Sequence, residues 1–123
     1  MTSIDIGPYE PGEGHPQIAG SFPRYFYKMV WERKELSLIE AIRKATLLPA
    51  ETLKLPTKGR MAIGADADFV IFDPETIQDG SEFLGFGEPD APPTGIQSVW
   101  VNGVLAIRDN QDQEKRSGKI ERS

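Results

Sequence analysis

The chain lacks cysteine altogether and has a single histidine among its 123 residues. Without cysteine, a disulfide scaffold, a thiolate zinc site and catalysis by a thiol are all excluded. A hydrolytic zinc ion needs three protein ligands and one open position, and histidine is the commonest ligand. Since His15 is the one imidazole of the chain, the sequence predicts that no complete metal site is present: metal ligands, none.

Long hydrophobic runs and clusters of positive charge are also missing. No apolar run approaches the roughly 20 residues of a membrane span, and the polar N-terminal segment has no signal-peptide core. Lys and Arg are dispersed, and the net charge is −5. These features predict a cytoplasmic protein with neither a nucleic acid nor a membrane as partner.

The first 21 residues are rich in glycine and proline, which disfavours continuous helix or strand there and predicts a loop. A helix over about 23–33 is predicted from apolar residues at i, i+3, i+4, i+7 and i+8. The residues of this stripe are Phe22, Tyr25, Phe26, Met29 and Val30.

A second helix is predicted after Ser37, because Ser37 and Glu40 have the spacing of a capping box. Its apolar face consists of Leu38, Ala41, Ile42 and Ala45. Pro49 suits the first turn of a further short helix, which we expect to end near Leu55.

Strands are predicted in the second half of the chain. The run 69–72 is apolar and rich in β-formers, which favours a buried strand. Asn102-Gly103 separates two further β runs, and this dipeptide suits the positive φ angles of a type I′ hairpin turn. Residues 76–95 are predicted to be irregular, and either mobile or covered by a partner. The polar tail after 109 is expected to fray unless residues 119–121 add an edge strand, and the fold class is α+β.

Few residues have the spacing of a catalytic constellation. Asp66 and Asp68 could divide acid and base roles, but their place just before a strand favours a turn-fixing role. The Gly85-Phe86-Gly87 segment is not predicted to bind phosphate, because an acidic residue and a proline follow it. Trp31 and Trp100 are interpreted as core aromatics.

Several motifs resemble known hydrolases. Gly14-His15-Pro16, residues 19–24, 36–44 and 48–51 resemble the last barrel segment of the N-acyl-D-amino-acid deacylases. Residues 59–73, which contain Gly-Ala-Asp-Ala-Asp-Phe-Val, and residues 99–103 resemble the small C-terminal β domain of the amidohydrolases.

The resemblance implies the last helices of an incomplete (β/α)8 barrel over residues 1–57. It also implies part of a small C-terminal β-sandwich over residues 58–123, with a hairpin at 102–103 and a polar tail. The chain would then be the C-terminal part of a metal-dependent amidohydrolase that acts on linear amide C–N bonds. It is expected to be inactive as an isolated chain, to need the missing N-terminal barrel as its partner, and to use zinc in the full-length enzyme.

In such enzymes a zinc-bound hydroxide attacks the amide carbonyl, and an aspartate moves the proton from water to the leaving nitrogen. Asp5 resembles that catalytic aspartate, although Ile4 separates it from Ser3 where the family often has adjacent Ser-Asp. Gln17 stands where the family tends to carry Arg. Substrate-binding residues are left unassigned.

Two other interpretations remain open at this point. The chain could be a stand-alone, non-catalytic α+β module that binds a partner through its aromatic helix. It could also belong to a cyclic amidase resembling dihydroorotase or hydantoinase. If the helix at 22–31 and the strand at 69–72 require cover from absent elements, the isolated chain is expected to expose apolar surface and to self-associate.

Overall fold

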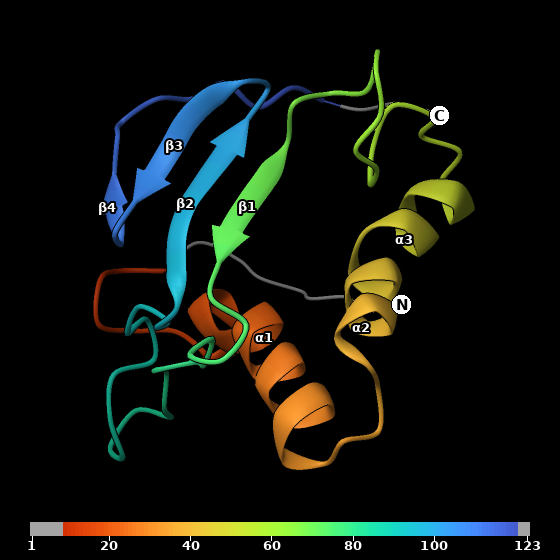
Figure 1. Ribbon diagram of the computed structural model, residues 1–123. Coiled ribbons are helices and arrows are strands. Elements are labelled where there is room, and N and C mark those ends of the chain that lie inside the picture. The colour runs from red at the N-terminus through yellow and green to blue at the C-terminus, as the bar shows by residue number, and fades with distance from the viewer. Residues whose placement is uncertain (1–8, 121–123) are drawn as a thin grey trace. The chain divides into compact units, whose positions relative to one another are not determined.

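The computed structural model describes residues 9–120, which form helices and one antiparallel sheet (Figure 1). This agrees with the predicted α+β class. In chain order the elements are α1 (Gln17–Phe26), the π-helical segment η1 (Tyr27–Glu32), α2 (Leu38–Ala45), α3 (Leu47–Thr52), β1 (Phe69–Phe72), β2 (Ile96–Val101), β3 (Val104–Arg108) and β4 (Gln111–Asp112).

Two compact units are each built from two separate stretches of the chain. Among the described residues, one unit comprises 39–72 with 96–120, and the other comprises 9–38 with 73–95. This division differs from the predicted boundary between 1–57 and 58–123. That boundary concerns the domains of a whole enzyme, so it stays a prediction.

Helix α1 begins six residues earlier than predicted, at Gln17, and contains Pro23 in its interior. Pro16 stands at the N-cap with φ −54°, a value that the proline ring favours and that suits the start of a helix. The amide of Gly20 already donates to the Pro16 carbonyl at 2.9 Å. The loop prediction for 17–21 was therefore wrong, because Pro16 and not Pro23 starts the helix.

The aromatic stripe is only partly buried within this chain. Phe26 and Val30 are buried, whereas Phe22 and Trp31 remain 39% and 40% exposed. Beyond Phe26 the helix widens into η1, where the Arg33 amide donates to the Lys28 carbonyl five residues earlier. The prediction of Trp31 as a core aromatic was wrong for the chain as described.

The segment 73–95 has no helix, as predicted, but it is fastened within its own unit. The Arg24 Nε donates to Asp79 Oδ2 at 2.6 Å, and the same guanidinium donates to the Ser81 carbonyl at 3.1 Å. The Ser81 hydroxyl donates to the Pro16 carbonyl at 2.9 Å, and the Gly12 amide donates to Asp90. These contacts hold the segment within its own unit, and cover by a partner over its exposed side chains stays a prediction.

Close approach of this segment to α1 depends on Gly20. A Cβ placed on Gly20 would lie 2.1 Å from the Ser81 hydroxyl oxygen and 3.4 Å from the Asp79 Cβ. Ser81 is only 1% exposed, so its hydroxyl has little room to move and keep a hydrogen bond. The absence of a side chain at residue 20 therefore allows the Ser81 hydroxyl to reach the Pro16 carbonyl.

The two short helices follow the prediction closely. Helix α2 begins at Leu38, directly after Ser37, and Ala41 on its apolar face is fully buried. Helix α3 carries Pro49 in its first turn and ends at Thr52, slightly before the predicted end.

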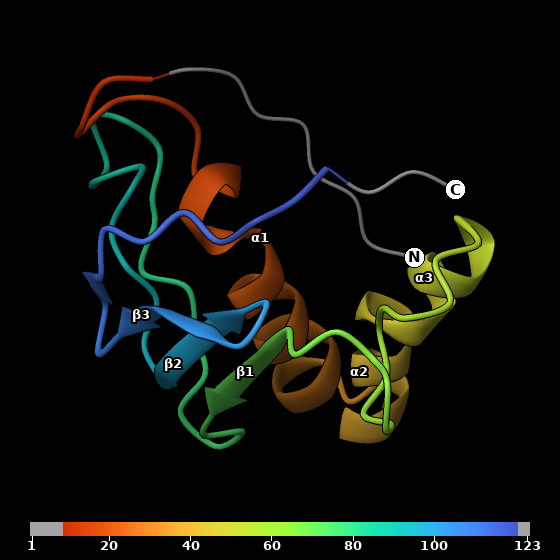
Figure 2. The same cartoon turned by 90° about the horizontal axis from the view of Figure 1, so that it is seen from above.

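The sheet has the strand order β1-β2-β3-β4, and all of its pairings are antiparallel (Figure 2). Phe69 on β1 stands opposite Trp100 on β2, and their rings stack at 5.5 Å. Strand β1 is an edge strand of the described sheet, and Val70 and Ile71 are 48% and 46% exposed. The prediction of a buried strand was therefore wrong for this chain, although its position and length were right.

The hairpin between β2 and β3 is confirmed. Asn102 and Gly103 have φ angles of 49° and 75°, as a two-residue type I′ turn requires. Strand β4 at 111–112 was not predicted, because two polar residues give no β pattern. Residues 119–120, the described part of the suggested tail strand, are not in a strand.

Asp66 and Asp68 form a polar cluster with Lys58 ahead of β1. The Lys58 ammonium lies 3.3 Å from Asp66 and 2.6 Å from Asp68, and the other Asp68 oxygen accepts from the Asn102 amide at 2.7 Å. The hydrogen bond from Lys58, followed by that from Asn102, lowers the pKa of Asp68. Hydrogen bonds from Thr57 and then Lys58 lower the pKa of Asp66. This cluster supports the turn-fixing interpretation of the pair, because both carboxylates hold neighbouring loops together.

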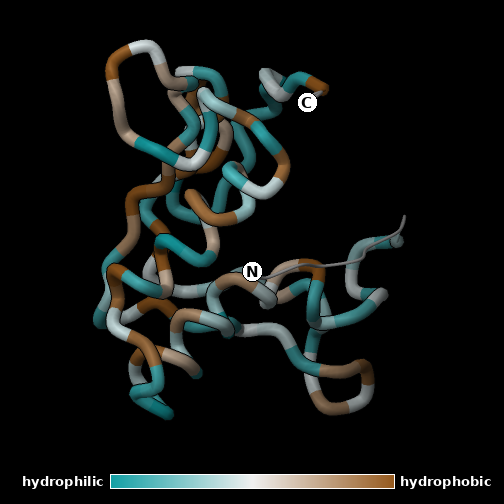
Figure 3. Tube along the Cα trace, turned by 90° about the vertical axis from the view of Figure 1, so that its right-hand side faces the viewer, coloured by the Kyte–Doolittle hydropathy of each residue, from teal (hydrophilic) through white to brown (hydrophobic). Residues whose placement is uncertain are grey.

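Hydrophobic and hydrophilic stretches alternate along the trace without a long apolar run (Figure 3). Within the described residues, no helix is both long and apolar enough to cross a membrane.

The Gly20→Ala substitution is predicted to lower the free energy of unfolding by about 1–3 kcal/mol, the usual range for stranding a buried polar group. The added methyl group displaces the Ser81 hydroxyl from the Pro16 carbonyl. Urea unfolding followed by fluorescence measures the change. Gly118→Ala is the matched control, because a Cβ there meets nothing within 4 Å. Equal stability of the two variants would contradict the packing described.

Acid is predicted to weaken the Lys58 cluster. Because the folded-state pKa values of Asp66 and Asp68 lie below the ordinary 3.8, their contribution is complete above that pH and is lost as the pH falls through the lowered values. Asp68→Asn should lower stability by about 1 kcal/mol at neutral pH, after allowance for solvent screening. It should also flatten the acid dependence of thermal unfolding. Asp109→Asn, the same change of charge on an exposed turn, should keep the wild-type slope, and a wild-type slope in Asp68→Asn would contradict the assignment.

Candidate functional site

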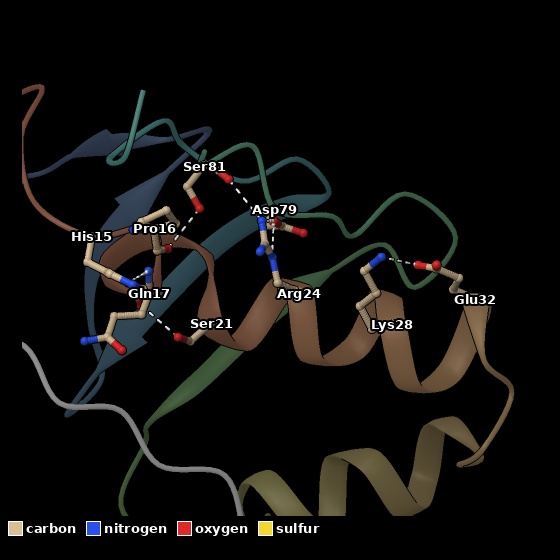
Figure 4. Close-up of polar contacts among 9 residues, drawn as sticks. All are labelled: His15, Pro16, Gln17, Ser21, Arg24, Lys28, Glu32, Asp79 and Ser81. Atoms are coloured by element: carbon tan, nitrogen blue, oxygen red, sulfur yellow. Dashed lines mark hydrogen bonds and ion pairs between the residues drawn. The ribbon is translucent and has the colours of Figure 1, made fainter. Parts of the chain in front are cut away.

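A small hollow lies where the Gly-His-Pro loop meets helix α1. Gln17, Ser21 and Arg24 follow one another at i, i+4 and i+7, so they share one face of the helix, and Figure 4 shows their side chains with His15 and Ser81. The hollow measures about 200 Å³. Its lining comprises His15, Pro16, Gln17, Gly20, Ser21, Arg24 and Phe83.

His15 is exposed and is oriented by two neighbours. Its Nδ1 accepts a hydrogen bond from the Gln17 amide at 3.2 Å, and its ring meets Phe83 edge to face at 5.0 Å. Because Nδ1 accepts, a neutral ring carries its proton on Nε2 and presents a donor there. In this tautomer His15 can donate to a bound oxygen atom, but it offers a metal no lone pair at Nε2.

Arg24 supplies positive charge at the other end of the hollow. Its guanidinium pairs with Asp79, whose side chain is 9% exposed, while that of Arg24 is 41% exposed. Ser21 donates its hydroxyl proton to the Gln17 carbonyl at 2.9 Å, as Figure 4 shows. Most of the polar groups around the hollow are therefore engaged in holding the loop, the helix and the 79–81 segment together.

The side chains present do not fit a hydrolytic zinc ion. Among residues 9–120, no group of three His, Cys, Asp or Glu side chains lies close enough to hold a metal. Asp66 and Asp68 lie together, but both are engaged with Lys58. These described residues by themselves therefore support no catalytic step that depends on a metal.

The outcome differs among the residues that the sequence singles out. Asp5 lies outside the described residues, so the structure does not test its position. The Gly85–Gly87 segment forms a small turn in which the Gly87 amide donates to the Phe83 carbonyl. Trp100 is half-buried and stacked on Phe69, as expected of a core aromatic.

The partnership between Arg24 and Asp79 was not predicted from the sequence. Arg24 belongs to the Phe-Pro-Arg motif, but Asp79 lies 55 positions later in a segment without periodicity. Only the fold brings the two together. Glu75 and Glu82 lie close to Asp79 in the sequence, so no local signal singles out Asp79 as the partner of Arg24.

Comparison with known proteins identifies relatives across most of the chain. The model of the Amidohydrolase family matches residues 2–107. An N-acyl-D-glutamate deacylase from Alcaligenes xylosoxydans xylosoxydans is 38% identical over 106 residues, which cover 86% of this chain and 21% of that protein. An N-acyl-D-aspartate deacylase from the same organism is 34% identical over 113 residues, which cover 92% of this chain and 22% of that protein.

The solved structures that resemble this chain include a D-aminoacylase and an N-acyl-D-glutamate deacylase. A D-aminoacylase crystal structure superposes with a TM-score of 0.82 at 31% identity, covering 89% of this chain and 22% of that one. An N-acyl-D-glutamate deacylase from Bordetella bronchiseptica, solved with zinc and a phosphonate mimic of the tetrahedral intermediate, gives 0.79 at 33% identity, with the same coverage of both chains.

These findings confirm the resemblance to the N-acyl-D-amino-acid deacylases. The chain spans about a fifth of the length of the curated relatives it matches. On the family match and on the agreement of sequence and fold, the chain belongs to the amidohydrolase family.

Proposed function

We propose that the chain is the C-terminal part of a metal-dependent amidohydrolase that cleaves the linear amide bond of N-acyl-D-amino acids. The observation that carries the proposal is the 38% identity with an N-acyl-D-glutamate deacylase across 86% of the chain. A second deacylase and a D-aminoacylase match over 92% and 86% of the chain. No cyclic amidase is needed to account for these similarities, so the deacylase interpretation is favoured over the hydantoinase-like one.

The architecture proposed for the whole enzyme is the one that the resemblance to the amidohydrolases implies. Residues 1–57 would contribute the last helices of a (β/α)8 barrel, and residues 58–123 would contribute part of a small β-sandwich. The TM-score of 0.82 with a D-aminoacylase supports this proposal.

Zinc is the proposed metal, and its ligands would come from the rest of the polypeptide. Support comes from the zinc in the Bordetella bronchiseptica relative and from the absence of a ligand group among the residues described here. When bound, the ion would polarise the amide carbonyl and activate water.

Asp5 is the proposed general acid and base. Its carboxylate would take a proton from the attacking water and later deliver it to the leaving nitrogen, so that the amide C–N bond breaks as an amine departs. The stretch from residue 2 that matches the family model includes Asp5. A cytoplasmic location, and an N-terminal barrel as the chief partner, complete the proposal.

A chimera tests this function directly. The matched C-terminal segment of the N-acyl-D-glutamate deacylase is replaced by this chain, and hydrolysis of N-acyl-D-glutamate, N-acyl-D-aspartate and a hydantoin is measured with zinc. We expect the chimera to cleave at least one N-acyl-D-amino acid, and Asp5→Asn to reduce the rate by about 10²–10⁴-fold.

Two comparisons make the chimera experiment decisive. Asp109→Asn removes an equal charge from an exposed turn and should retain activity. The isolated chain with zinc should have none. A folded, zinc-loaded chimera that cleaves only the hydantoin, or an Asp5→Asn variant with full activity, would contradict the proposal.

Uncovered apolar side chains should make the isolated chain self-associate. In the unit that contains the sheet, Met61 and Ile63 are essentially fully exposed beside a hollow of about 530 Å³, and Val70 and Ile71 are about half exposed. We propose that other parts of the enzyme cover these residues.

Light scattering over a concentration series should show growing particle mass for the isolated chain. Met61→Gln with Ile63→Gln should reduce that growth, because it removes exposed apolar area. Lys115→Gln with Glu114→Gln is a control that changes two exposed polar residues. A wild-type chain that stays monomeric at high concentration would contradict the proposal.

A further inference from the structure

The Asn102-Gly103 turn combines a reactive dipeptide with an unusual set of restraints. An asparagine side chain is most open to attack by the next backbone nitrogen when that residue is glycine, because no Cβ hinders the approach. Asn102 is half-buried and Gly103 is exposed. The turn is therefore accessible to water and carries the atoms of a self-modification reaction.

The chain beyond β4 lies along this hairpin. We call residues 113–118 the C-terminal strap. The Gln113 amide donates to the Ala106 carbonyl at 2.9 Å, and the Ser117 hydroxyl donates to the Val101 carbonyl at 2.7 Å. The Asn102 Nδ2 donates to the Ser117 carbonyl at 2.7 Å. The side-chain amide that deamidation would remove is thus one of the groups that hold the strap.

We propose that Asn102 is a spontaneous deamidation site whose reaction is restrained by the turn contacts and whose product releases the C-terminal strap. The Gly103 nitrogen loses its proton to solvent and bonds to Asn102 Cγ. The Cγ–Nδ2 bond breaks, and ammonia leaves. Water then opens the resulting succinimide to aspartate or isoaspartate, so no oxidant, reductant or enzyme is required.

Three hydrogen bonds oppose this reaction in the folded chain. The Gly103 N–H donates to the Ala67 carbonyl at 2.9 Å, which disfavours loss of the proton from the attacking atom. The Asn102 amide donates to Asp68 at 2.7 Å and fixes the backbone of the turn. The bond from Nδ2 to Ser117 holds the side chain toward the strap. Rotation of Asn102 toward Gly103 has to break or weaken these contacts.

Aspartate and isoaspartate at residue 102 would both weaken the contacts between the hairpin and the strap. With aspartate, an oxygen replaces the Nδ2 donor and faces the Ser117 carbonyl, so an attractive contact becomes a repulsive one. With isoaspartate, the main chain gains a methylene group, which a two-residue turn joining Val101 to its partner Val104 cannot absorb without a change of register. Both products therefore loosen the strap. Because the change at residue 102 is covalent, unfolding and refolding the chain does not reverse it.

The rate of deamidation tests the proposal in paired variants. Purified chains are incubated in mildly alkaline buffer, and Asn102 is followed by peptide mass spectrometry, with the urea-unfolded chain as reference. Asp68→Ala removes the acceptor of the Asn102 amide, while Asp66→Ala removes a neighbouring carboxylate that does not contact the turn. Ser117→Ala removes the Val101 contact of the strap, while Lys115→Ala changes an exposed strap residue.

We expect the folded wild type to deamidate severalfold more slowly than the unfolded chain. Asp68→Ala and Ser117→Ala should be severalfold faster than wild type, and their controls should match it. Equal rates in Ser117→Ala and Lys115→Ala, or no deamidation in any folded variant, would overturn the proposal. If Asp68→Ala fails to fold, the Ser117 pair still decides the question.

The consequence of the reaction is measured separately. Hydrogen exchange at the Gln113 amide should be faster in Asn102→Asp and in aged wild type than in fresh wild type. The Asp109 amide, which donates to the Gln97 carbonyl, should be unchanged and serves as an internal reference. Unaltered exchange at Gln113 would contradict release of the strap.

Discussion

Few large apolar side chains are buried among residues 9–120, and this constraint shapes the rest of the described structure. Among the described residues, the buried hydrophobic set is Phe26, Val30, Ala41, Ala50 and Ile77. Two of these are alanines, so apolar burial within the chain is small. Polar contacts therefore hold the loops: Arg24 with Asp79 in one unit, and Lys58 with Asp66 and Asp68 in the other.

The same constraint connects the fold to the proposed function. Apolar side chains that the chain leaves exposed, such as Trp31 in one unit and Ile63 in the other, agree with a segment whose surfaces pack against more protein. The relatives are about five times longer than the matched segment. The potential metal ligands of the described residues agree with this interpretation. His15 accepts a hydrogen bond at Nδ1, and Asp66 and Asp68 are engaged with Lys58.

Local patterns predicted local structure well. The Asn102-Gly103 turn, the start of α2 after Ser37 and the extent of β1 follow from backbone preferences, which need no knowledge of distant residues. The start of α1 was missed because two prolines compete for the first turn, and sequence alone did not favour Pro16. The exposure of Val70 and Ile71 could not be predicted from the apolar run 69–72. Such a run indicates that a strand requires apolar cover, but it does not indicate whether this chain provides that cover.

The candidate site was less predictable, and for a different reason. The motif around His15 and the Phe-Pro-Arg stretch located one wall of the hollow. Phe83 lines the hollow from the 73–95 segment. Asp79 and Ser81 hold that segment against α1, and their positions depend on the close approach permitted at Gly20. Such contacts join segments more than 50 residues apart, and no local periodicity encodes them.

We propose that this chain contributes to an amidohydrolase without holding the catalytic metal itself. Equilibrium dialysis of the folded 123-residue chain against zinc, with the metal content of the retained protein measured by mass spectrometry, tests it most directly. We expect no stoichiometric zinc and no difference between wild type and His15→Ala. One tightly held zinc ion per wild-type chain, lost in His15→Ala, would contradict it.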